Sequence, residues 1–189
     1  MEVKKRKCKE CRAEFTPYSS LITWCSPNCG YMVSQKALKR TEAKKEKKER
    51  ALHREKKKAV KRRSEWLADL QIEVNKYIRL RDKDEPCCTC GKTDEGVQYH
   101  AGHYLSRGAF PDLRFELTNN HKQCATCNTY KGGERDIYQQ FIIEKYGKEH
   151  DEWLRCKENH PMLKDTLPHW QDIEAEIKRY RKLNRDFKA

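Results

Sequence analysis

The sequence has no long apolar stretch and is poor in apolar residues overall. No run approaches the ~18 apolar residues that a transmembrane helix needs, so we expect no membrane partner. The first residues, MEVKKRKCKEC, lack the apolar segment of a secretory signal. Hydrophobic residues make up 36% of the 189 positions, which argues against one large core. We therefore expect small domains held together by something other than hydrophobic burial alone.

Glycine and proline are absent from residues 31–82, a segment rich in helix-forming Lys, Glu, Ala, Leu and Arg. Between Lys36 and Arg63, 15 lysines and arginines stand against four glutamates, and this excess supplies most of the net charge of +13. Apolar residues are too few there for a coiled-coil seam. The pattern predicts a solvated basic helix, which either binds DNA phosphates or serves as a charged spacer. The expected DNA contacts on it, which we favour over the spacer, are Lys44, Lys45, Lys47, Lys48, Arg50, Arg54, Lys56, Lys57 and Lys58.

Two later segments carry apolar residues at helical spacing. One runs from Trp66 to Ile78 and the other from Trp170 to Tyr180. Each predicts an amphipathic helix. Their apolar faces either pack within one chain or form the contact of a homodimer.

Cysteine is abundant, and its spacing indicates zinc rather than disulfides. Eight of the ten cysteines form four close pairs, which in a chain without a secretory signal favours a reducing, cytoplasmic compartment. Two sets of four thiolates would each fill a tetrahedral zinc site and leave no open position, so neither site should be catalytic. The N-terminal set either only stabilises the fold or also contacts DNA or a partner. The two predicted sets are Cys8, Cys11, Cys25 and Cys29, and Cys87, Cys90, Cys124 and Cys127. Cys88 is ambiguous because it lies beside two ligands, and Cys156 should be a free thiol.

Histidines and asparagines lie between the two halves of the second cysteine set. The segments HAGHYLSRG (100–108) and LTNNHKQCATCN (117–128) offer a general base and metal ligands for phosphodiester hydrolysis. His103 is the candidate base, because imidazole can accept a proton near neutral pH. An amide oxygen such as that of Asn128 suits Mg²⁺ or Mn²⁺. The side chains expected to bind phosphates here are Arg107, Arg114 and Lys131.

The order His103, Asn119, Cys124-x2-Cys127-Asn128 resembles the HNH (ββα-metal) nucleases. The resemblance implies that Asn119 orients the catalytic His103 and that Asn128 binds the catalytic metal. Many members of that group carry an aspartate directly before the histidine, where this chain has Gly102. Another residue must then supply the second ligand: His100 and His121 are the candidates, with Asp112 a weaker one.

Over nearly its whole length the sequence also resembles the Rap/NinG recombination proteins of lambdoid phages. The resemblance rests on the N-terminal cysteines, the basic helix, and the order AGHYLSRG, LTNNHKQCATCN, KGG. It implies a structure-specific endonuclease in the host-cell cytoplasm that cleaves branched DNA such as Holliday junctions and D-loops. Nicking two opposed strands would suit a homodimer with two active sites.

The sequence therefore predicts an α+β protein with four parts. These are a four-cysteine zinc module (1–30), a helical arm (31–82), a zinc-stabilised HNH-like nuclease core (83–148) and C-terminal helices (149–189). The expected cofactors are two structural Zn²⁺ and a catalytic Mg²⁺ or Mn²⁺. Two alternatives stay open: a non-catalytic zinc-dependent nucleic-acid-binding protein, which Gly102 favours, and a sequence-specific HNH endonuclease.

Overall fold

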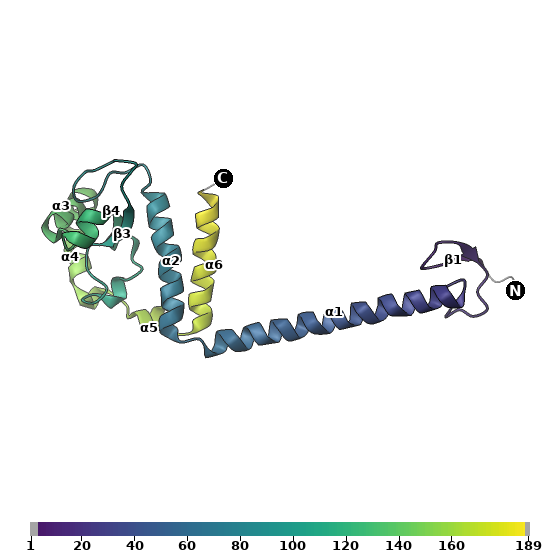
Figure 1. The fold of residues 1–189 in the computed structure, drawn as a ribbon. Helices are drawn as coiled ribbons and strands as arrows, with labels where there is room; N and C mark the ends of the chain where they lie inside the picture. The colour runs from purple at the N-terminus through teal and green to yellow at the C-terminus, as the bar shows by residue number, and fades with distance from the viewer. Residues whose placement is uncertain (1–3, 188–189) are drawn as a thin grey trace. The chain divides into compact units, whose positions relative to one another are not determined.

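A computed structural model describes residues 4–187 and divides the chain into two compact units, Met1–Val60 and Lys61–Ala189 (Figure 1). The boundary falls inside the segment 31–82 that we predicted as one helical arm. The segments 83–148 and 149–189 both belong to the second unit.

The first unit consists of a small hairpin, the first cysteine set and one long helix. Strand β1 (Arg6–Lys7) pairs antiparallel with β2 (Glu14–Phe15), and α1 spans Pro27–Val60. Helix α1 begins within the WCSPNCG turn, because Pro27 suits the first helical position and has no amide hydrogen to leave unpaired. None of its described side chains is buried, as expected for a solvated basic helix.

The second unit is built on two long helices that lie side by side. Helix α2 (Arg63–Arg81) packs along α6 (Trp170–Asp186) (Figure 1). The rings of Trp66 and Trp170 stack with their centroids 5.5 Å apart. The buried residues of this core are Trp66, Leu70, Val74, Ile78, Ile173, Ile177 and Tyr180. The two apolar stripes thus pack against each other within one chain, which removes them as the dimer contact.

A two-stranded antiparallel sheet lies against α2. Strand β3 (Tyr99–His103) pairs with β4 (Asn120–Cys124), with Gly102 opposite His121 and His103 opposite Asn120. The connection contains two short 3-10 helices, Pro111–Leu113 and Leu117–Asn119. Directly after β4, Thr126–Tyr130 forms a π-helical turn. Within the described residues, β3 has a strand neighbour on one side only, so its other edge is free.

Two helices complete a second core beyond the sheet. Helix α3 (Arg135–Tyr146) and α4 (Lys148–Arg155) are joined at Gly147, whose φ of 92° is a conformation that glycine adopts at low cost. The buried residues here are Cys88, Tyr104, Leu105, Leu113, Tyr138, Ile142 and Leu154. A 3-10 turn (Lys157–Asn159) and the short helix α5 (Leu163–Thr166) lead to α6.

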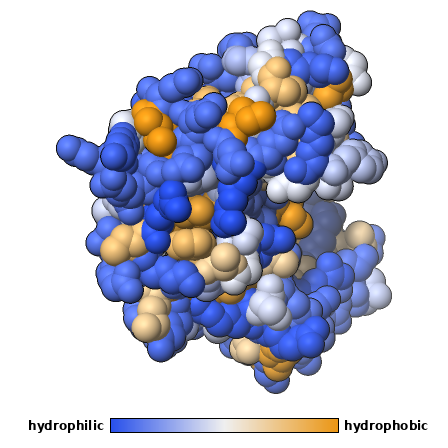
Figure 2. Space-filling model, turned by 90° about the vertical axis from the view of Figure 1, so that its left-hand side faces the viewer, coloured by the Kyte–Doolittle hydropathy of each residue, from blue (hydrophilic) through white to orange (hydrophobic). Residues whose placement is uncertain are grey.

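The helix-rich α+β class predicted from the sequence is confirmed, with two small sheets and two cysteine clusters among residues 4–187. The face in Figure 2 is mainly hydrophilic, and its apolar side chains form small separate groups, in keeping with a charged content of 38%. Across residues 4–187, no helix has both the length and the apolar character needed to cross a membrane.

Candidate functional site

The second cysteine set forms a closed sulfur cluster. The Sγ atoms of Cys87, Cys90, Cys124 and Cys127 all lie within 4.8 Å of one another. Sulfurs bound 2.3 Å from one tetrahedral zinc lie about 3.8 Å apart, and the Sγ atoms of Cys90 and Cys124 are 3.8 Å apart. The backbone N–H of Cys124 also donates to the Cys87 sulfur over 3.2 Å, which favours a thiolate. This cluster can hold zinc.

The first cysteine set is arranged in the same way. Its four Sγ atoms, from Cys8, Cys11, Cys25 and Cys29, also lie within 4.8 Å of one another. The Cys25 and Cys29 sulfurs are 3.7 Å apart, again close to the tetrahedral spacing. Each compact unit thus has its own cluster that can hold zinc.

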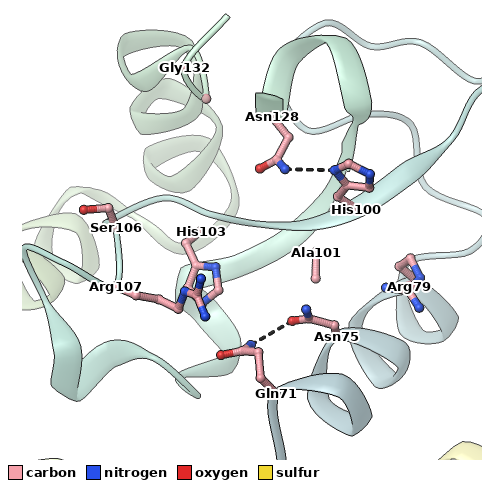
Figure 3. A pocket seen from close by; sticks show the side chains of 11 residues that line it. Gln71, Asn75, Arg79, His100, Ala101, His103, Ser106, Arg107, Asn128 and Gly132 are labelled. Carbon is pink, nitrogen blue, oxygen red and sulfur yellow. Dashed lines mark hydrogen bonds between the residues drawn. The ribbon is translucent and has the colours of Figure 1, made fainter. Parts of the chain in front are cut away.

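An open pocket of about 450 Å³ lies along the free edge of β3. Side chains from α2 form one wall, and the π-helical turn with the glycines after it forms the other (Figure 3). Its lining residues are Gln71, Asn75, Arg79, His100, Ala101, His103, Ser106, Arg107, Asn128, Gly132 and Gly133. None of these is acidic. The pocket therefore combines two imidazoles and two guanidinium groups with no opposing carboxylate.

His103 is held in the tautomer that a general base needs. Its Nε2 lies 3.0 Å from the carbonyl oxygen of Arg114. A carbonyl only accepts hydrogen bonds, so neutral His103 carries its proton on Nε2 and leaves Nδ1 free to accept one. Burial lowers the pKa of His103, and the charges of Arg107 and Arg114 lower it further, against an opposing effect of the hydrogen bond. The imidazole is therefore neutral at physiological pH.

His100 and Asn128 meet at the opposite side of the pocket. The amide Nδ2 of Asn128 donates to Nδ1 of His100 over 3.0 Å (Figure 3). The lone pair of His100 thus points at the Asn128 amide. Of the candidates for a second ligand, His100 is the one that the fold brings to Asn128.

Gly102 is explained by the same packing. A Cβ at this position would lie 2.3 Å from Oε1 of Gln123 and 3.2 Å from Oδ1 of Asn128. Two amide oxygens thus occupy the space into which an acidic side chain would project. The Oε1 of Gln123 is buried and has no hydrogen-bond partner. This acceptor was not identified from the sequence. Gln123 is far from Gly102 along the chain, and only the pairing of β3 with β4 brings the two together.

Asn119 does not orient His103, contrary to the expectation. Its buried amide accepts a hydrogen bond from the backbone N–H of Leu105 and donates to the carbonyls of Leu105 and Leu113. It therefore closes the loop between β3 and β4. The group that holds His103 is the backbone carbonyl of Arg114 within that loop.

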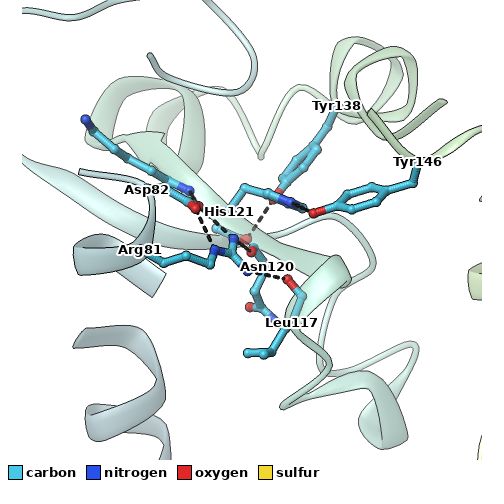
Figure 4. Close-up of polar contacts among 9 residues, drawn as sticks. Arg81, Asp82, Leu117, Asn120, His121, Tyr138 and Tyr146 are labelled. Carbon is cyan, nitrogen blue, oxygen red and sulfur yellow. Dashed lines mark hydrogen bonds and ion pairs between the residues drawn. The ribbon is translucent and has the colours of Figure 1, made fainter. Parts of the chain in front are cut away.

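His121 lies in the core rather than in the pocket. Its ring is 1% exposed and lies between the hydroxyls of Tyr138 and Tyr146, at 3.2 and 2.8 Å (Figure 4). Burial lowers its pKa to about 3. The candidacy of His121 as a ligand or catalytic group was wrong. Asp112 also points elsewhere, since its carboxylate accepts from the backbone N–H of Leu163.

The predicted phosphate-binding cations have different surroundings. Arg107 lines the pocket. The guanidinium of Arg114 donates to the Gln71 side chain and to the Leu67 carbonyl, which anchors its loop to α2. Lys131 forms an ion pair with Glu134 at 2.7 Å. Arg107 is thus the one of these three whose side chain lines the pocket that contains His103.

The basic residues predicted on α1 are all on the solvated helix. Three of them lie near glutamates of the same helix, as in the pairs Lys45–Glu49, Arg50–Glu46 and Lys58–Glu55. Such exposed pairs contribute at most about 1 kcal/mol and open readily to a stronger anion.

Three pocket residues on α2 were missed in the sequence. Gln71, Asn75 and Arg79 are four residues apart, so they share one face of the helix. The four-residue spacing of these polar side chains could have indicated a shared polar face. We interpreted this helix only from its apolar residues.

The family match and the similar proteins all carry the same family name. Residues 1–188 match the family described as "Bacteriophage Lambda NinG protein". The protein ninG of Escherichia phage lambda is 37% identical over 188 residues, covering 91% of this chain and 89% of the relative. The protein ninG of Salmonella phage P22 is 40% identical over 159 residues, covering 76% of each. No solved structure gives a significant match.

These matches correct one sequence interpretation. We interpreted the chain as a member of the Rap/NinG recombination endonucleases within the HNH nucleases. The matching family and the similar relatives carry the name NinG alone, with neither a Rap nor an HNH description.

Proposed function

The chain belongs to the NinG family of bacteriophage proteins, and we propose that its second compact unit is a metal-dependent DNA endonuclease. The observation that carries the proposal is His103, held as a neutral base in an open pocket beside the His100–Asn128 pair. We infer that β3, β4 and the π-helical turn form a ββα-metal core.

In this scheme the protein supplies a general base, His103, and a positive charge that binds the phosphate, Arg107. Nδ1 of His103 accepts the proton of the attacking water, while the Arg114 carbonyl stabilises the imidazolium through Nε2. Arg107, exposed in the same pocket, binds the phosphate. Burial of His103 keeps it neutral and available before each turnover.

Nδ1 of His100 and the amide oxygen of Asn128 would hold the catalytic metal. The donors fit: rotating the Asn128 amide turns its oxygen toward His100, and the unpaired Oε1 of Gln123 lies close by. An oxygen-rich set with one imidazole suits Mn²⁺ or Mg²⁺ with water as further ligands. When bound, the ion neutralises charge on the phosphate and the leaving oxygen.

Branched DNA is the proposed substrate, with the host cell as the setting. The 34-residue helix α1, with no buried side chain and a large excess of positive charge, supports binding to phosphates outside the active site. A homodimer would place two active sites on opposed strands of a junction. Comparing cleavage of junction DNA with cleavage of linear DNA tests this choice of substrate directly.

The test is cleavage of end-labelled four-way junction and matched linear duplex by the zinc-loaded protein, with Mg²⁺, with Mn²⁺ and with neither. We expect metal-dependent nicks near the branch. His103→Ala should lose cleavage at unchanged junction affinity, whereas His53→Ala, an exposed histidine outside the pocket, should cleave normally.

One other function has an observation in its favour. No carboxylate lines the pocket, as expected for a protein that binds nucleic acid without cutting it. Junction binding without cleavage in both metals would support this function and contradict ours. Cleavage of linear duplex at one defined sequence would instead indicate a sequence-specific endonuclease.

A further inference from the structure

The α2 wall of the pocket presents hydrogen-bond donors with a fixed orientation. The guanidinium of Arg114 donates to Oε1 of Gln71 over 2.8 Å, and Nε2 of Gln71 donates to Oδ1 of Asn75 over 2.7 Å. The amide oxygen of Asn75 is thereby occupied. Its Nδ2 is left as a donor on the pocket side, one helical turn before Arg79.

The charge of this wall is not compensated within the protein. Arg79 is exposed and, within the described residues, forms no ion pair or hydrogen bond. Arginines nearby behave differently: Arg81 pairs with Asp82, and Arg181 pairs with Glu73. Arg107 across the pocket likewise has no acidic partner among residues 4–187. Two free guanidinium groups in a pocket without carboxylates form a site for anions.

Arg79 and Arg107 come from different sides of the pocket. Figure 3 shows Arg107 beside His103, whereas Arg79 extends from α2 on the other side of the pocket, below His100. The spacing suits an anion with repeated charges, such as a nucleic-acid strand.

We propose that Arg79 and Asn75 bind a backbone phosphate adjacent to the one at His103 and Arg107. Helix α2 then forms the second wall of a groove that holds one DNA strand along the free edge of β3. The proposal rests on the proposed function for the position of the reacting phosphate. It adds a binding subsite on an element that otherwise forms the core with α6.

The experiment measures binding separately from cleavage. Affinity for a labelled junction is determined in zinc-containing buffer without Mg²⁺ or Mn²⁺, across a salt series, for the wild type, Arg79→Gln and Arg185→Gln. Arg185 is an exposed arginine of α6 outside the pocket, so its variant matches the change in net charge. Because Arg79 is exposed, its variant should fold normally, which thermal unfolding checks.

We expect Arg79→Gln to lower affinity several-fold. The slope of log affinity against log salt should become shallower by about 0.7 to 0.9, as expected when one phosphate is no longer neutralised. Arg185→Gln should leave the slope unchanged. Equal slopes for the two variants would overturn the subsite.

Cleavage then separates this proposal from the proposed function. At saturating DNA, Arg79→Gln should retain kcat while its KM rises, since it binds a phosphate that does not react. A reduced slope in a protein that never cleaves would support the subsite and overturn the nuclease. Cleavage with an unchanged slope would overturn the subsite and keep the nuclease.

Discussion

His103 and His121 lie on different strands of the β3–β4 hairpin, in different surroundings. Both lie in the histidine-rich segment, and both can accept a proton. Gly102 pairs with His121 and His103 with Asn120, so the two rings project from opposite faces of the hairpin. One reaches the pocket and the other the core formed with α3. The residue types were predictable, but their faces depended on a strand register that the sequence does not specify.

The environment of His103 predicts that kcat/KM falls on acidification only at unusually low pH. Burial and the charge of Arg107 disfavour the imidazolium, so the base should stay neutral below its ordinary pKa of about 6.5. The limb of kcat/KM should therefore lie below that value. Arg107→Gln removes one of the causes and should move the limb to higher pH. A limb above pH 6.5 in the wild type would contradict the assignment of His103 as the base.

His121 should affect stability rather than catalysis. Its folded pKa of about 3 lies below the unfolded value of about 6.5, so acid favours the unfolded chain. Its stabilising contribution is present above pH 6.5 and is lost as pH falls toward 3. His121→Gln should retain cleavage and show a weaker loss of stability between pH 7 and pH 5 in urea unfolding. Identical pH dependence in the two proteins would exclude this role.

Gly102 should not tolerate a side chain, even the acid that a metal site would favour. A Cβ would meet Oε1 of Gln123 at 2.3 Å. Gly102→Ala should cost about 1–3 kcal/mol in urea unfolding, and Gly102→Asp should lower activity rather than raise it. The matched control is Gly96→Ala, since a Cβ there meets nothing within 4 Å. Higher activity of Gly102→Asp would show that the space is available.

Among the elements, those with a strong local signal were predicted well. The solvated basic helix and the two amphipathic helices, over Trp66 to Ile78 and Trp170 to Tyr180, follow from composition and spacing. The polar face of α2 was not predicted as part of the site. It lines the pocket only because β3 packs beside α2 in the folded chain. The link from Arg114 through Gln71 to Asn75 spans two segments far apart in sequence, and no local pattern encodes it.

Helix α1 should dominate the salt dependence of DNA binding. Its side chains are solvated, so their charges are available to phosphates. Replacing Lys44, Lys45, Lys47 and Lys48 with glutamine should flatten the salt slope by roughly 0.9 for each phosphate that is no longer neutralised. The control changes four exposed lysines of the second unit, Lys148, Lys164, Lys178 and Lys182. A slope equal to that of the control would make α1 a spacer.

At the scale of the whole molecule, each compact unit contains one sulfur cluster. The first unit has no apolar core cluster among its described residues, so its fold depends most on its cysteines. The second unit also has two apolar cores. The spacing of the cysteines predicted both clusters, whereas the two-unit division follows from contacts between distant segments.

Metal analysis should find two zinc ions per chain. Cys8→Ser should lower the count by one and unfold mainly the first unit, while Cys124→Ser should remove the other ion and abolish cleavage. Metal content, with limited proteolysis to report on each unit, measures both effects. A full count of zinc in either variant would contradict the assigned ligands.

The peptide bond between Cys127 and Asn128 joins the sulfur cluster to the pocket. A shift of Cys127 on zinc loss would be passed directly to Asn128, whose amide lies 3.0 Å from Nδ1 of His100. Thermodynamic linkage makes this dependence mutual: if zinc raises the affinity of the His100–Asn128 pair for its metal, occupancy of that pair must raise the affinity of the cluster for zinc by the same factor. On the proposed function, a protein engaged with substrate and metal would therefore resist chelators that strip the free protein.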